Sequence, residues 1–183
     1  MTLTVFGQWL RVLAAFVVMG SAALGLQIAS GGLASADHGI QCFNDTSQHQ
    51  YTGYDSDDTL TGNDNPNVMA GKGGVDTIYG EDANDQICGN LGSDAISGSS
   101  GSDKIDGGPG DDILVGFAGG DVLNGDDGTD KMLGSLGDDH LEGQQGGDDL
   151  LEFPGEGNGD YGDGGDGHDE CDPAIETRVR CEA

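Results

Sequence analysis

The sequence predicts an all-β fold, a solenoid of stacked parallel strands, from three columns of one nine-residue repeat. The repeat runs without a slip from Asp58 to Leu151, and its clearest copy is GGPGDDILV at Gly107–Val115. Its first position is glycine from Gly62 to Gly143, its sixth is aspartate in every copy but one, and its eighth is a large apolar residue. Tandem repeats of fixed length indicate solenoids, in which each repeat packs on its neighbours. A disordered Gly- and Asp-rich segment is the alternative, and it would scramble the register of the three columns.

The eighth position predicts the core. Neighbouring side chains of a strand point to opposite faces, so the eighth residue points inward while the seventh and ninth point outward. The outward positions are mostly polar or small, as at Thr61, Asp106 and Glu142. The inward column consists of Leu60, Met69, Ile78, Ile87, Ile96, Ile105, Leu114, Leu123, Met132, Leu141 and Leu150.

The sixth position predicts metal ligands. A turn that surrounds a cation must aim carbonyl oxygens inward, which requires positive φ at some residues, and glycine adopts positive φ without a steric penalty. A short carboxylate beside those carbonyls suits Ca²⁺, a hard cation that takes roughly six to eight oxygen ligands. The predicted carboxylate ligands are Asp58, Asp76, Asp85, Asp94, Asp103, Asp112, Asp121, Asp130, Asp139, Asp148, Asp160 and Asp169.

Turn glycines are predicted to complete each metal site in the best-matching stretch, from Gly98 to Asp148. They are Gly98, Gly101, Gly107, Gly108, Gly110, Gly116, Gly119, Gly125, Gly128, Gly134 and Gly137. Two early turns depart from the template, because Asn67 brings no charge and Ala83 stands where the fourth-position glycine belongs. We expect these two turns to bind Ca²⁺ weakly or not at all.

This pattern resembles the RTX family, also called hemolysin-type calcium-binding repeats, and in particular its small secreted members of actinobacterial type. The resemblance covers Asp58 to Leu151 and resumes at Gly164–Asp172, where Cys171 takes the apolar slot. It implies a right-handed parallel β-roll, in which each repeat is a six-residue turn followed by a three-residue strand. It further implies that two repeats form one coil and that several Ca²⁺ ions lie between stacked turns.

Charge points to cations as partners. The chain has 34 acidic residues against 6 Lys and Arg, a formal net charge of -28. Like charge of this size opposes compaction, and bound metal ions would neutralise it. A basic protein partner is the alternative. Nucleic acid is not expected as a partner, because the few basic residues could not form a basic footprint.

The predicted domain organisation starts with an export signal at residues 1–36, which contains the apolar stretch Val12–Ile28 and ends in the small residues Ala34-Ser35-Ala36. An uncleaved membrane anchor is the alternative. Cleavage would give a secreted, extracellular protein with no stable membrane insertion. The mature chain is then predicted to contain an N-terminal cap at 37–56, the roll at 57–172 and a C-terminal tail at 173–183. In the tail, Ile175 and Val179 are expected to cover the last coil.

Four cysteines fit an oxidising compartment. We favour links between Cys42 and Cys88 and between Cys171 and Cys181, because Cys88 is an outward ninth-position residue and Cys181 follows a turn after Cys171. Four cysteines allow three pairings, so other links, or free thiols, are alternatives.

The leading functional hypothesis is a calcium-binding protein, with a binding partner that the sequence does not reveal. An enzyme is not expected, because the scattered histidines form no HExxH motif and no GxSxG motif occurs. The alternative is an extracellular adhesion or matrix module with structural Ca²⁺. A contiguous apolar stripe on the outer face would favour that alternative, but the sequence suggests only scattered outward apolar residues.

Overall fold

The fold is known from a computed structural model that describes residues 49–152 and 159–181. The predicted signal peptide and most of the predicted cap, including Cys42, lie outside these residues. Within the described part, all regular elements are β-strands. No helix in that part could cross a membrane.

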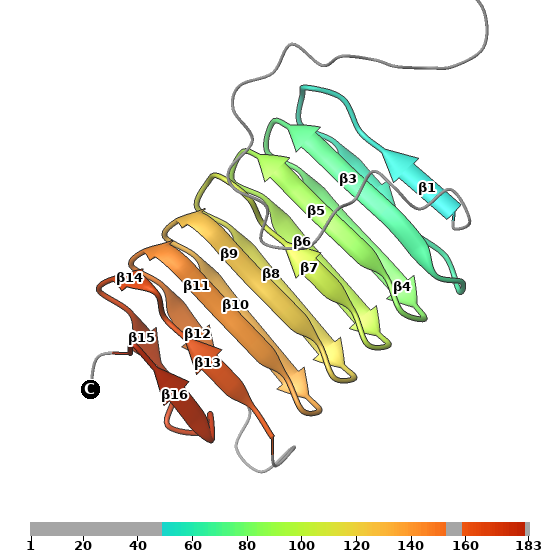
Figure 1. Ribbon diagram of the computed structural model, residues 1–183. Coiled ribbons are helices and arrows are strands. Elements are labelled where there is room, and N and C mark those ends of the chain that lie inside the picture. Colours follow the sequence, from blue (N-terminus) through green and yellow to red (C-terminus); the bar gives the residue numbers. More distant parts are fainter. Residues whose placement is uncertain (1–48, 153–158, 182–183) are drawn as a thin grey trace, which may run out of the picture. The chain divides into compact units, whose positions relative to one another are not determined.

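The strands follow one another in a simple order along the chain (Figure 1). They are β1 (His49–Thr52), β2 (Thr59–Thr61), β3 (Asn67–Gly73), β4 (Thr77–Asp82), β5 (Gln86–Leu91), β6 (Ala95–Ser100), β7 (Lys104–Asp106), β8 (Ile113–Ala118), β9 (Val122–Gly128), β10 (Lys131–Leu136), β11 (His140–Gly146), β12 (Asp149–Leu151), β13 (Tyr161–Asp163), β14 (Asp166–Gly167), β15 (Glu170–Cys171) and β16 (Thr177–Val179).

Successive repeats alternate between two sheets, which confirms the predicted β-roll. One sheet has the order β1-β3-β5-β7-β9-β11-β13-β16, and the other has the order β15-β12-β10-β8-β6-β4-β2. Paired strands are parallel and lie one coil apart, so that Ile96 pairs with Leu114 in one sheet and Ile105 with Leu123 in the other. Two nine-residue repeats therefore make one coil, and turns that are 18 residues apart stack directly on each other.

The eighth-position residues form the predicted core between the two sheets. From Met69 to Leu150 they are buried in one continuous cluster, and Leu60 at the N-terminal end is partly buried against it. Cys171 and Ile175 continue the cluster at the C-terminal end. A column of one buried side chain per repeat explains why such a thin domain still has an apolar interior.

The tail fills a gap in that core. Gly162 stands at an eighth position and has no side chain, and an ideal Cβ there would lie 3.0 Å from Ile175 Cδ1 and 3.2 Å from Leu150 Cδ2. Ile175 thus packs where the missing side chain would be. Val179, expected beside it, is instead 37% exposed on β16. The expectation was therefore right for Ile175 and wrong for Val179.

Most strands are longer than the three residues that the resemblance implied. In β4 and β6, pairing continues past the first-position glycines, through Glu81↔Ser99 to Asp82↔Ser100. The second turn position has a left-handed backbone, with φ of 78° at Glu81, 80° at Ser99 and 77° at Phe117. A left-handed backbone raises the free energy of a non-glycine residue by about 1–2 kcal/mol. This cost explains why glycine suits the second position of the repeat, as at Gly108. Because stacked coils repeat the same dihedral angles, the ladder can continue through the turn.

Both ends of the roll extend beyond the predicted borders. At the N-terminus, β1 pairs with β3, and Tyr51 packs against the core. At the C-terminus, β16 pairs with β13, and the Arg180 guanidinium holds the Asp163 carboxylate through two contacts of 2.7 Å.

A disulfide joins Cys171 to Cys181, as the sequence analysis predicted. It closes the segment between the last eighth-position residue of the roll and the end of the described tail. The link between Cys88 and Cys42 stays a prediction, because Cys42 lies outside the described residues.

Candidate metal centres

The sixth-position residues form two ladders of buried carboxylates. In each ladder, one carboxylate oxygen accepts the backbone N–H of the sixth-position residue one coil earlier. Asp112 Oδ1 accepts from Asp94 N at 2.7 Å, and Asp121 Oδ1 accepts from Asp103 N at 2.8 Å. The first ladder contains Asp58, Asp76, Asp94, Asp112, Asp130, Asp148 and Asp169. The second ladder contains Asn67, Asp85, Asp103, Asp121, Asp139 and Asp160.

The predicted carboxylate residues thus all lie in the ladders, including the two beyond the end of the regular repeat at Leu151. Asp160 Oδ1 accepts from Asp139 N at 2.9 Å, and Asp169 Oδ1 accepts from Asp148 N at 3.0 Å. Asp58, at the N-terminal end, differs because it is only partly buried and its Oδ2 accepts from Tyr54 N at 2.6 Å. Within the folded roll, these hydrogen bonds fix the orientation of each carboxylate.

In most of these carboxylates, the second oxygen has no hydrogen-bond partner. In both ladders, every aspartate from Asp76 to Asp148 is buried and has an Oδ2 atom without a hydrogen bond. A buried anionic oxygen without a partner is costly, since it has lost its hydration and gained nothing in exchange. A row of such atoms therefore indicates that a cation completes the site.

The cost of burying these charged oxygens raises the pKa values of the ladder carboxyls. Burial, reinforced by repulsion from the neighbours in the same ladder, raises the pKa of Asp112 to about 8 and that of Asp103 to about 7. The same causes raise the pKa of Asp130 to about 7. A bound cation would reverse this effect, because it stabilises the ionised form of each carboxyl.

Glycines at the first turn position border the unpartnered oxygens. A Cβ added to Gly98 would collide with Asp103 Oδ2 and would lie 3.0 Å from the carbonyl oxygen of Gly116. Carboxylate and carbonyl oxygens thus converge on a space that any side chain would fill. A Cβ added to Gly107, Gly116, Gly125 or Gly134 would likewise collide with the Oδ2 atom of the aspartate five residues later. The donors present, carboxylate and carbonyl oxygens in one place, fit Ca²⁺.

The other predicted glycines are needed for close packing of the coils, and their part in the metal sites stays a prediction. At Gly101, Gly110, Gly119, Gly128 and Gly137, a Cβ would collide with a backbone carbonyl of the coil before. The fourth-position glycines therefore let the turns stack closely. Gly108, in the second position, has the left-handed backbone that this position adopts in every repeat from Lys72 to Gln144.

In the turn that ends at Asn67, the side-chain amide of this residue occupies the place where a cation would bind. Asn67 Nδ2 donates to the carbonyl oxygen of Asn63 at 3.1 Å, to that of Asn65, and to Asp85 Oδ1 at 2.9 Å. Oxygens that would face a cation here face amide hydrogens instead. This geometry supports the expectation of a weak site or none. In the turn with Ala83, by contrast, Asp85 Oδ2 remains buried without a partner.

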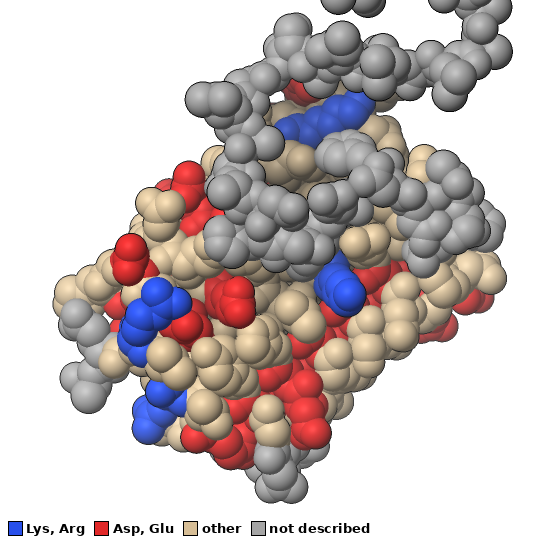
Figure 2. Space-filling model, viewed as in Figure 1, with Lys and Arg blue, Asp and Glu red and all other residues tan. Residues whose placement is uncertain are grey.

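The outer surface near the turns is also acidic. In Figure 2, Asp and Glu side chains are frequent along the edge of the roll where turns stack, and Lys and Arg side chains are sparse on the same face. Exposed acids there include Asp111, Asp127 and Asp138. These surface charges attract cations at long range, whereas the buried ladders offer the directed ligand oxygens.

Comparison with known proteins agrees with this chemistry. The family model of the RTX calcium-binding nonapeptide repeat matches four overlapping segments, at residues 52–87, 61–96, 89–123 and 115–150. Together these segments cover more than half of the chain. The chain belongs to this RTX repeat family. No curated protein and no solved structure matches it.

One buried acid among the described residues, Glu152, lies outside the RTX template and was not among the predicted site residues. Glu152 stands nine residues after Gly143, where the next first-position glycine would be, just past the matched segments. It is only 4% exposed, its Oε2 accepts from Ser135 N at 3.0 Å, and its Oε1 has no partner. Burial, and then repulsion from Asp139 and Asp160, raises its pKa to about 7. In the sequence, the replacement of the first-position glycine by Glu152 was the one sign that this residue has a special role.

Proposed function

We propose that this RTX protein is a secreted calcium-binding protein whose roll folds around Ca²⁺ ions held between stacked turns. The observation that carries the proposal is the row of buried, unpartnered Oδ2 atoms along both ladders. Membership of the calcium-binding repeat family supports the choice of ion. The export signal expected in residues 1–36 and the Cys171–Cys181 disulfide support secretion, since disulfides persist in oxidising compartments.

The ladders suggest which residues hold each ion. Consecutive members of a ladder would share one cation, as Asp94 and Asp112 would in the first ladder and Asp103 and Asp121 in the second. In each residue Oδ1 is held by a backbone N–H, which leaves Oδ2 for the metal. When bound, Ca²⁺ supplies positive charge that neutralises the stacked carboxylates. We propose that the protein binds Ca²⁺ without catalysing a reaction, because a role as metal ligands explains why these carboxylates are buried.

Calorimetric titration of the full chain with Ca²⁺ tests this proposal. We expect saturable binding of several ions per chain, with dissociation constants in the range typical of extracellular modules, about 10⁻⁴–10⁻³ M. Titration with Mg²⁺ is the control, and it should give much weaker binding, because Mg²⁺ demands a small octahedral site and dehydrates reluctantly. Absence of saturable Ca²⁺ binding up to about ten times that range would contradict the proposal.

An added role in surface adhesion is a second candidate, and the structure contains a feature that favours it. Val115, Leu133 and Leu151 are ninth-position residues that pair across β8, β10 and β12. They form a contiguous apolar row on the outer face, extended by the exposed Ile113 on the same face of β8. The sequence suggested scattered residues because these three positions are separated by 18 residues along the chain. A partner surface would most favourably contact this row.

A further inference from the structure

The second ladder gains a third carboxylate at the point where the repeat breaks. We propose that Asp139, Glu152 and Asp160 together form a Ca²⁺ site of different composition from the turn sites, and that this site fills first. The inference rests on the proposed function, because it assumes that the roll binds Ca²⁺.

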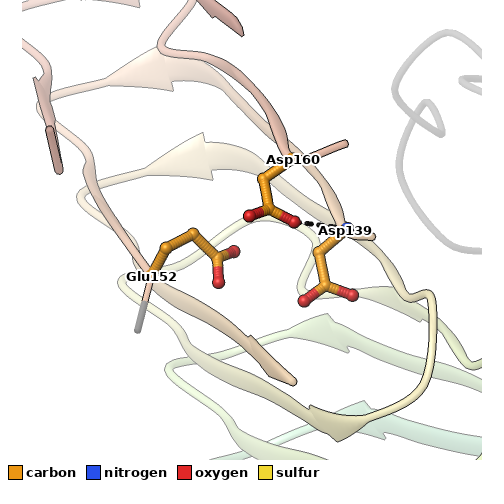
Figure 3. Close-up of side chains that lie close together, drawn as sticks. All are labelled: Asp139, Glu152 and Asp160. Carbon is orange, nitrogen blue, oxygen red and sulfur yellow. Dashed lines mark hydrogen bonds between the residues drawn. The ribbon is translucent and has the colours of Figure 1, made fainter. Parts of the chain in front are cut away.

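The spacing of the three carboxylates suits one ion. Each residue offers one oxygen, and the three oxygens lie within 4.8 Å of one another. Oxygens on opposite sides of Ca²⁺ are about 4.6–5.2 Å apart, since each Ca–O distance is about 2.3–2.6 Å. Figure 3 shows the three carboxylates around a shared space, with Glu152 reaching in from the side opposite the two aspartates. One cation could therefore contact all three without a rearrangement of the backbone.

Two of the three oxygens have no partner at present. Asp139 is 1% exposed and Glu152 is 4% exposed, and the free oxygen of each, Oδ2 and Oε1, has no hydrogen bond. A buried glutamate with an unsatisfied oxygen beside two aspartates has no structural benefit unless a cation joins them. This separates the cluster from the many exposed acids on the surface.

The local backbone holds the cluster in position. Ser135 N donates to Glu152 Oε2 at 3.0 Å, and Asp139 N donates to Asp160 Oδ1 at 2.9 Å. Gly134 leaves the space that the glutamate needs, because a Cβ there would collide with Glu152 Oε1. In the folded roll, these ligand side chains need little further ordering to contact an ion, which favours affinity.

Charge and rigidity predict that this site binds before the others. A site between two ladder aspartates brings two carboxylates, whereas this cluster brings three. Affinity for Ca²⁺ in proteins depends on the number of charged ligands and on the rigidity of the site. We therefore expect one ion to bind at least about tenfold more tightly than the rest, a difference of about 1.4 kcal/mol.

Calorimetric Ca²⁺ titration of the full chain and of Glu152→Gln tests the inference. Glutamine keeps the size of the side chain and an oxygen for Ser135 N, but it removes the charge. The tight step of the wild-type titration should weaken at least tenfold or disappear in Glu152→Gln, while the weaker steps remain. Glu170→Gln is the matched control, because Glu170 is an exposed acid on β15 and should leave all steps unchanged.

The outcomes separate the two proposals. A tight step that survives in Glu152→Gln, or that never occurs in the wild type, overturns the inference and leaves calcium binding by the ladders intact. A wild-type chain that binds no Ca²⁺ overturns both. If Glu152→Gln does not fold at saturating Ca²⁺, Glu152→Gly restores the residue that the repeat has at its first position. Loss of the tight step in that variant supports the inference, and its retention overturns it.

Discussion

Calcium-free protein should be more stable near pH 5 than near pH 8. An unfolded aspartate titrates near 3.8, whereas burial and neighbouring carboxylates raise the pKa of Asp112 to about 8 and that of Asp103 to about 7. Between these values the folded form binds more protons than the unfolded form. The free energy of unfolding must then fall as the pH rises, by about 1.4 kcal/mol per pH unit for each proton that only the folded form holds.

Urea unfolding of the calcium-free chain, from pH 5 up to the pH at which the fold is lost without Ca²⁺, measures this effect. Several ladder carboxyls act in the same direction, and repulsion among the surface acids adds to them. The calcium-saturated chain is the control, and its stability should rise over the same pH window, because metal binding requires deprotonated ligands. If the calcium-free chain kept the same stability or gained stability from pH 5 to pH 8, the carboxylates of the ladders would not be the strained groups that we infer.

The exchange Asp112→Asn should raise the Ca²⁺ midpoint of folding about tenfold or more, equal to about 1.4 kcal/mol. Asp112 lies inside the first ladder, where it accepts from Asp94 N at 2.7 Å and donates its own N–H to Asp130 Oδ1 at 2.8 Å. Its loss would therefore disturb the sites on both sides. Asparagine can keep the bond to Asp94 N, but it brings no charge, and its amide group has only one oxygen.

Asp106→Asn is a closely matched control for that exchange. Asp106 is a ninth-position residue with partial exposure, and its Oδ1 lies 3.4 Å from Asn124 Nδ2. It is near enough to contribute to the raised pKa of Asp112, so both exchanges remove one charge from the same neighbourhood. We expect the Asp106 variant to shift the midpoint by less than about twofold, because partly exposed charges interact weakly. Equal shifts would mean that the acids act as a diffuse cloud of charge.

The repeat predicted most of the fold because each column has one physical role. The eighth column from Met69 to Leu150 is buried as expected, and the sixth column forms the ladders. The period also extends one repeat further towards the N-terminus than predicted, with Tyr51 packed against the core and Gly53 nine residues before Gly62. That repeat was not recognised because its sixth position is His49 and not aspartate, and the sixth-position aspartates are the clearest mark of a repeat.

The rest of the site could not be found from one repeat at a time. Glu152 interrupts the first column, and only the stacked coils show that its carboxylate reaches Asp139 and Asp160. At Asn67, too, the sequence leaves the role of the side chain open, because an asparagine can direct either its oxygen or its amide group at the site. Only the structure shows that Nδ2 points to the neighbouring oxygens, where a cation would otherwise lie. Contacts between coils join residues about 18 positions apart. Such contacts can be predicted only when the number of residues in one coil is known.

Far-UV circular dichroism during a Ca²⁺ titration of the calcium-free chain near pH 8 tests the central claim most directly. Because Ca²⁺ binds the folded roll and not the unfolded chain, it should drive folding by mass action. We predict a largely disordered spectrum in chelator, a cooperative gain of β structure as Ca²⁺ is added, and its loss when chelator is restored. A β spectrum that is present in chelator and unchanged across the titration would contradict the claim that the roll folds around Ca²⁺.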